Sequence, residues 1–130
     1  MTNLIEYESA SDEVRAVYDD IRTTRQTEYI NNFWKALANH PPTLRRTWET
    51  LKEVMGGEGE IDPLTRELIY IAVSVTNGCE YCIASHTSAA RAKGLTEKVR
   101  GELLAIVAAA NSTNRLANGY QVPVDEQFKI

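Results

Sequence analysis

The chain has 130 residues, the length of one domain, and its 43% hydrophobic and 25% charged residues are typical of a globular protein. Its formal net charge of −4 argues against nucleic acid as the main partner, because phosphate binding needs a clustered basic face. The longest apolar run, 103–110, is far shorter than the ~20 residues that a membrane helix needs, and the first residues lack a secretory signal pattern. We therefore expect no membrane association and a cytoplasmic location.

The N-terminal half predicts three helices. Ser11 can cap the first, whose apolar residues recur at helical spacing before a polar stretch over 22–27: Val14, Val17, Tyr18 and Ile21. A short second helix stops at the prolines Pro41 and Pro42, and its apolar residues are Phe33, Trp34 and Leu37. Thr43 can cap the third, which ends at Gly56-Gly57 and carries Leu44, Trp48, Leu51 and Met55 on one side.

The C-terminal half predicts three more helices. Asp62 and Pro63 mark the start of one that is apolar on nearly all sides over 68–75 and stops at Asn77-Gly78. The next covers about 79–93 and ends at Gly94, and Thr96 then caps a long last helix with apolar residues from Val99 to Ala110. No strand pair or internal repeat is present. We predict an all-α fold, a compact bundle of about six helices, with residues 1–130 as a single domain.

The two cysteines form a single Cys-x-x-Cys, Cys79 and Cys82. In a protein with no secretory pattern, such a pair indicates redox chemistry or metal binding. On a helix, Cys79, Cys82 and His86 share one face, at i, i+3 and i+7. The start of a helix also favours the thiolate form, and His86 is close enough to Cys82 to accept a thiol proton.

Glu67 lies on the preceding predicted helix, beside its apolar stretch. If the two helices fold back at Asn77-Gly78, Glu67 can hydrogen-bond His86 and orient it as a base. Plainer interpretations remain open: two buried cysteines, an exposed Glu67, or a polar His86 on a helix face. The same residues could bind zinc, although zinc sites usually take their second ligand pair from a distant segment. The other histidine and the large aromatic residues are assigned structural roles in loop or core: His40, Trp34, Trp48, Tyr18 and Tyr70.

The pattern Glu-x11-Cys-x2-Cys-x3-His, formed by Glu67, Cys79, Cys82 and His86, resembles the signature of the alkylhydroperoxidase D-like proteins of the carboxymuconolactone decarboxylase superfamily. The resemblance covers about residues 30–115 and is closest to the peroxidase-related branch. Flanking segments that share it are Ala89-Ala90, Lys93-Gly94-Leu95-Thr96, His40-Pro41 and Trp48.

This resemblance implies an all-helical domain that works as a homo-oligomer, a trimer or a hexamer, and that needs no metal or other cofactor. It makes Cys82 the peroxidatic thiol and Cys79 the resolving thiol, with Glu67 and His86 as a proton relay. Tyr81 stands between the cysteines, where the best-known peroxidases of the family have a histidine, and it is a possible member of the relay. A phenol is a poor base near neutral pH.

Three functions follow as hypotheses. The first is a thiol peroxidase in antioxidant defence, which reduces hydrogen peroxide or organic hydroperoxides and is recycled by an external dithiol or lipoyl-type reductant. The second is a cofactor-free carboxymuconolactone decarboxylase-like lyase that uses His86 and Glu67 as acid and base. The third is a non-enzymatic redox sensor, in which disulfide formation changes a surface.

Overall fold

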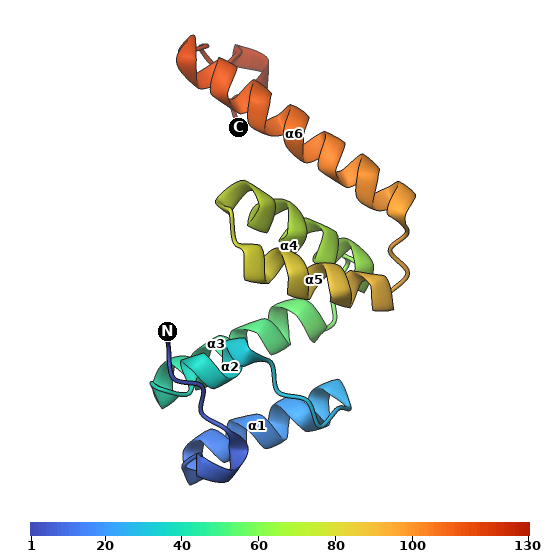
Figure 1. Ribbon diagram of the computed structural model, residues 1–130. Coiled ribbons are helices and arrows are strands. Elements are labelled where there is room, and N and C mark those ends of the chain that lie inside the picture. The colour runs from blue at the N-terminus through green and yellow to red at the C-terminus, as the bar shows by residue number, and fades with distance from the viewer. The chain divides into compact units, whose positions relative to one another are not determined.

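The computed structural model describes all 130 residues, and it is helical throughout, with six α-helices, two short 3₁₀ helices and no strand (Figure 1). This confirms the predicted all-α class and the number of helices. The chain divides into two compact units, residues 1–58 and 59–130. None of its helices combines the length and the apolar character needed to cross a membrane.

The first unit contains η1 (Tyr7–Ser9), α1 (Asp12–Arg25), α2 (Asn32–Leu37) and α3 (Pro41–Gly56). As predicted, the Ser11 side chain caps α1, since it accepts a hydrogen bond from the Val14 amide at 3.3 Å. The Trp34 and Trp48 rings meet edge to face in the core, with their centroids 5.5 Å apart. The largest side chains that are fully buried are Trp34, Tyr18, Ile21 and Leu44.

The start of α3 differs from the prediction. The helix begins at Pro41 with His40 as its N-cap residue, so Thr43 lies inside the first turn and does not cap it. Proline suits this position because the first amides of a helix have no partner within the helix, and a missing N–H costs nothing there. The Thr43 hydroxyl instead hydrogen-bonds the His40 Nδ1 atom at 2.8 Å.

The second unit contains α4 (Pro63–Asn77), α5 (Glu80–Ala92), α6 (Glu97–Gly119) and η2 (Glu126–Phe128). The predicted caps are confirmed, because Asp62 accepts a hydrogen bond from the Thr65 amide at 3.0 Å and Thr96 accepts one from the Val99 amide at 3.2 Å. Helices α4 and α5 pack side by side as an antiparallel hairpin, and α6 contacts α4 (Figure 1). A small core joins these helices: Ile71, Ala90 and Leu95.

Several apolar side chains of α4 and α6 are exposed in the chain. On α4, the exposed fraction is 49% for Ile69 and 54% for Val73, although the sequence predicts a helix that is apolar on nearly all sides. On α6, Ile106 and Leu116 are exposed as well. Helix α6 also continues to Gly119, well beyond the last apolar residue of its predicted stripe.

Candidate functional site

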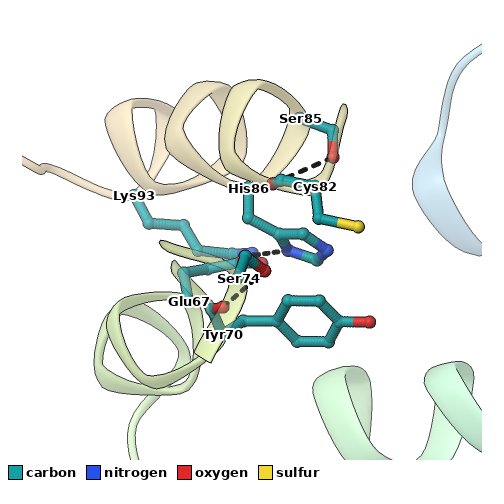
Figure 2. A network of polar contacts seen from close by, with 7 residues as sticks. All are labelled: Glu67, Tyr70, Ser74, Cys82, Ser85, His86 and Lys93. Atoms are coloured by element: carbon teal, nitrogen blue, oxygen red, sulfur yellow. Dashed lines mark hydrogen bonds and ion pairs between the residues drawn. The ribbon is translucent and has the colours of Figure 1, made fainter. Parts of the chain in front are cut away.

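The hairpin of α4 and α5 brings together the residues that the sequence singles out. Its turn is made by Gly78, whose φ of 70° lies in the left-handed region. A Cβ at Gly78 would meet no atom within 4 Å, so the demand for glycine comes from the backbone conformation and not from crowding. With the chain reversed at this residue, Glu67 on α4 faces His86 on α5 (Figure 2).

Glu67 and His86 form a direct hydrogen bond. The Glu67 Oε2 atom lies 2.7 Å from the His86 Nδ1 atom, as the sequence predicts. Glu67 is buried, so its interpretation as an exposed helix residue is wrong. An ionised carboxylate can only accept, so the His86 Nδ1 atom carries the hydrogen and the Nε2 atom of the neutral ring is left as an acceptor.

The second carboxylate oxygen of Glu67 is also occupied. The Lys93 Nζ atom donates to Glu67 Oε1 at 2.7 Å, from the C-cap position of α5. Burial opposes the ionisation of Glu67, but the hydrogen bonds and charges of His86 and Lys93 outweigh it, so the pKa of Glu67 is lowered from its usual value. Glu67 is therefore a carboxylate at neutral pH.

Tyr70 covers one face of the histidine. Its ring stacks on the His86 imidazole with centroids 3.7 Å apart and an angle of 21° between the planes. Tyr70 is half-buried and is not among the buried core residues to which the sequence assigns it. One turn further along α4, the Ser74 hydroxyl donates to the Tyr70 carbonyl at 2.7 Å. Figure 2 shows the Tyr70 hydroxyl, the outer edge of the imidazole and the Cys82 sulfur directed to the same side of the hairpin.

Sequence reasoning missed Tyr70 and Lys93 as site residues, although helical spacing offers a signal for both. Tyr70 follows Glu67 by three residues on α4, and Lys93 follows His86 by seven at the end of α5. Residues at these spacings share one face of a helix. The four side chains therefore lie on the facing sides of the hairpin.

The two cysteines are joined in a disulfide, with their Cα atoms 5.3 Å apart. Cys79 is the N-cap residue of α5, one position before the first turn in which the sequence places both cysteines. Its sulfur accepts a hydrogen bond from the Cys82 amide at 3.3 Å. Cys82 lies within the first turn, and its carbonyl accepts a hydrogen bond from the Ser85 hydroxyl at 3.3 Å.

Tyr81 lies between the cysteines in the first turn of α5, and 43% of it is exposed. Its part in a proton relay stays a prediction. No group of three or more His, Cys, Asp or Glu side chains is arranged to hold a metal ion.

The arrangement supports two kinds of chemistry. A cysteine pair can store and release two electrons as a disulfide and a dithiol. An imidazole held by a buried carboxylate can accept and return a proton. Cys82 precedes His86 by four residues, which is about one helical turn, on α5.

Comparison with known proteins places this chain in a family. Residues 41–125 match the carboxymuconolactone decarboxylase family. The crystal structure of the alkylhydroperoxidase AhpD core from Rhodospirillum rubrum is 52% identical, with a TM-score of 0.95, over 100% of this chain and 97% of that one. An uncharacterised protein of Cupriavidus necator is 32% identical over 83 residues, which are 64% of this chain and 73% of that protein.

A relative with a named activity matches over a shorter stretch. The alkyl hydroperoxide reductase AhpD of Solibacter usitatus is 38% identical over 64 residues, which are 49% of this chain and 34% of that protein. The extent of the family match and the agreement of the whole fold with the AhpD core lead to one assignment. The chain belongs to the carboxymuconolactone decarboxylase family, as an AhpD-like member.

Proposed function

We propose that the protein is a thiol peroxidase that reduces hydrogen peroxide or an organic hydroperoxide through a cycle between the Cys79–Cys82 dithiol and its disulfide. The observation that carries this proposal is the placement of a cysteine pair at the start of α5, one turn before a histidine that a buried carboxylate orients. The AhpD relatives support the same class of reaction.

The proposed cycle begins with the dithiol. The His86 Nε2 atom accepts the thiol proton of Cys82, and the thiolate attacks one peroxide oxygen and breaks the O–O bond. The new bond between sulfur and oxygen makes Cys82 a sulfenic acid. The other peroxide oxygen takes the proton from His86 and leaves as water or an alcohol. The Cys79 thiol then condenses with the sulfenic acid, which forms the disulfide and releases water. An external dithiol reduces this disulfide by exchange and is itself oxidised to a disulfide.

The test is peroxide consumption with dihydrolipoamide as the dithiol. We expect turnover by the wild-type protein and none by Cys82→Ser. The Cys79→Ser variant should react once with peroxide and leave a sulfenic acid on Cys82 that dimedone traps, as mass spectrometry would show. A sulfenic acid trapped on Cys79 in the Cys82→Ser protein would reverse the two roles. Absence of turnover in the wild type, with stoichiometric disulfide formation, would favour the redox sensor.

A lyase remains a second candidate because the family match extends over 41–125 and the Glu67–His86 pair is complete without either cysteine. In this case His86 and Glu67 act as acid and base on a small carbonyl compound. The double variant Cys79→Ser/Cys82→Ser separates the two candidates. A lyase would keep its activity in this variant, whereas the proposed peroxidase would lose all of it.

A further inference from the structure

The Glu67 carboxylate has a separate partner for each oxygen. His86 Nδ1 lies 2.7 Å from Oε2, and Lys93 Nζ lies 2.7 Å from Oε1. The exposed fraction is 5% for the Glu67 side chain and 38% for that of Lys93. The lysine therefore reaches from the surface at the end of α5 to a carboxylate that is almost removed from water.

A buried carboxylate needs a compensating positive charge, which a cation or a bound proton can supply. Lys93 is the cation that meets Glu67 here. The other nearby basic residue at the end of α5, Arg91, is paired with Glu97 of α6 at 3.0 Å, and Glu97 also binds Arg100. Two further titratable side chains are close to His86: Tyr70, whose ring stacks on the imidazole, and Cys82, one turn before it on α5.

Lys93 and His86 share one carboxylate, so the charge on one bears on the charge that is favourable on the other. With Lys93 in place, the carboxylate is neutralised without a proton, so the imidazole can stay neutral and keep an acceptor nitrogen. Without Lys93, the buried carboxylate loses a cation that favours its charged form, which makes proton uptake by the Glu67–His86 pair more favourable. A protonated imidazole has two donors and no acceptor, so it could not take a proton from a thiol.

We propose that Lys93 is a positioning residue: it holds Glu67 as a carboxylate and so keeps His86 neutral, with Nε2 free to accept the Cys82 thiol proton. The transfer of the Cys82 thiol proton to Nε2 rests on the proposed peroxidase function. The charge balance among Lys93, Glu67 and His86 does not, because it holds for any reaction in which His86 acts as a base.

The test compares Lys93→Met, which removes the ammonium, with Lys93→Arg, which keeps a positive charge. Lys93→Gln is a second neutral variant that keeps a hydrogen-bond donor, and it replaces Lys93→Met if that protein does not fold. Lys98→Met is the matched control, since Lys98 is an exposed lysine at the start of α6. The readout is the titration of the His86 ring in the reduced proteins, followed by ¹⁵N NMR between about pH 5 and 9.

We expect the midpoint of the ring titration to rise by about one pH unit in Lys93→Met and Lys93→Gln, the usual size of the effect of one nearby charge. Lys93→Arg and Lys98→Met should titrate like the wild type. The acid limb of the pH profile for peroxide reduction should move with the ring titration. An unchanged midpoint in folded Lys93→Met or Lys93→Gln would overturn the inference. A raised midpoint in a protein that consumes no peroxide would support the inference and overturn the proposed function instead.

Discussion

Among single residues, Glu67 decides the electrostatics of the site. Its carboxylate is buried on α4, yet it is ionised because His86 and Lys93 bind one oxygen each. Removing one partner of such a pair costs far more than the pair itself contributes, because the other charge stays behind without compensation. Conservative changes at Glu67 are therefore informative about both function and stability.

Replacing Glu67 with Gln should slow the reaction of Cys82 with peroxide by on the order of 10²–10⁴-fold, the size of a general-base contribution. The amide cannot hold His86 in the same tautomer with the strength of a carboxylate, and it leaves the Lys93 ammonium without its anion. Stopped-flow kinetics of the reduced proteins would measure this loss. If Glu67→Gln and His86→Ala both react with peroxide as fast as the wild type does, the proton relay has no support.

The Glu67→Gln substitution should also change how the free energy of unfolding depends on pH. The pKa of Glu67 is lowered in the folded protein from its usual value of 4.5, so its ionisation stabilises the fold above this pH. This contribution should disappear as the pH falls through the lower pKa of the folded state. Urea unfolding at several pH values should show the wild type more stable than Glu67→Gln near neutral pH, with a difference that narrows in acid.

At the scale of helices, the α4–α5 turn determines whether the site forms. Gly78 has a φ of 70°, and an alanine in this conformation costs roughly 1–2 kcal/mol. Gly78→Ala should therefore lower the free energy of unfolding by this amount and weaken the Glu67–His86 contact across the turn. Chemical denaturation would measure the first effect, and the ring titration of His86 the second.

Gly101 provides the matched control. It lies inside α6, and a Cβ there would also meet no atom within 4 Å. Because its backbone is helical, Gly101→Ala should stabilise the protein by about 0.5–1 kcal/mol. Opposite signs for the same substitution at two uncrowded glycines would show that backbone conformation decides the outcome. A neutral Gly78→Ala would contradict this account of the turn.

Helix ends could be predicted from the sequence where they depend on residues that are close together in the chain. The caps at Asp62 and Thr96 and the stop at Gly78 depend on a few neighbouring residues, and the sequence located all three. The error at Thr43 arose because a proline pair indicates both the end of one helix and the start of the next. The hydrogen bond between Glu67 and His86 could be predicted because the stop at Gly78 implied that the two helices fold back.

Tyr70 and Lys93 were missed for a physical reason. A tyrosine within an apolar run has the pattern of a core residue, and a lysine at the end of a helix has the pattern of a solvated charge that complements the helix dipole. Helical spacing places both residues on the inner faces of the hairpin, and the packing of α5 against α4 gives their partners: Tyr70 stacks on His86 and Lys93 binds Glu67.

At the scale of the molecule, the exposed apolar surface bears on the prediction that the protein forms a homo-oligomer. Side chains with large exposed fractions occur on α4, on α6 and in the segment after it: Ile69, Val73, Ile106, Leu116, Val122, Val124 and Phe128. Burying such surface between copies stabilises an assembly, and closed symmetry is the usual form of a homo-oligomer. The trimer or hexamer that the family resemblance implies stays a prediction.

Light scattering at micromolar concentration should give three or six times the 14.6 kDa of one chain. Introducing a charge at an exposed apolar position of α6, as in Ile106→Glu, should reduce this mass, whereas a change at an exposed polar position, as in Lys98→Met, should not. A mass of one chain for the wild-type protein would contradict the expectation.

The compactness of the site along the chain also bears on the order in which the protein folds. Every described contact among its functional side chains lies between Glu67 and Lys93, and the longest of them spans 26 residues. Loop closure over such short separations costs little entropy, and contacts this local are the ones that form early in folding. The charged network can therefore assemble as the hairpin closes, before the last helix is added, and hydrogen exchange during refolding would record α4 and α5 gaining protection together.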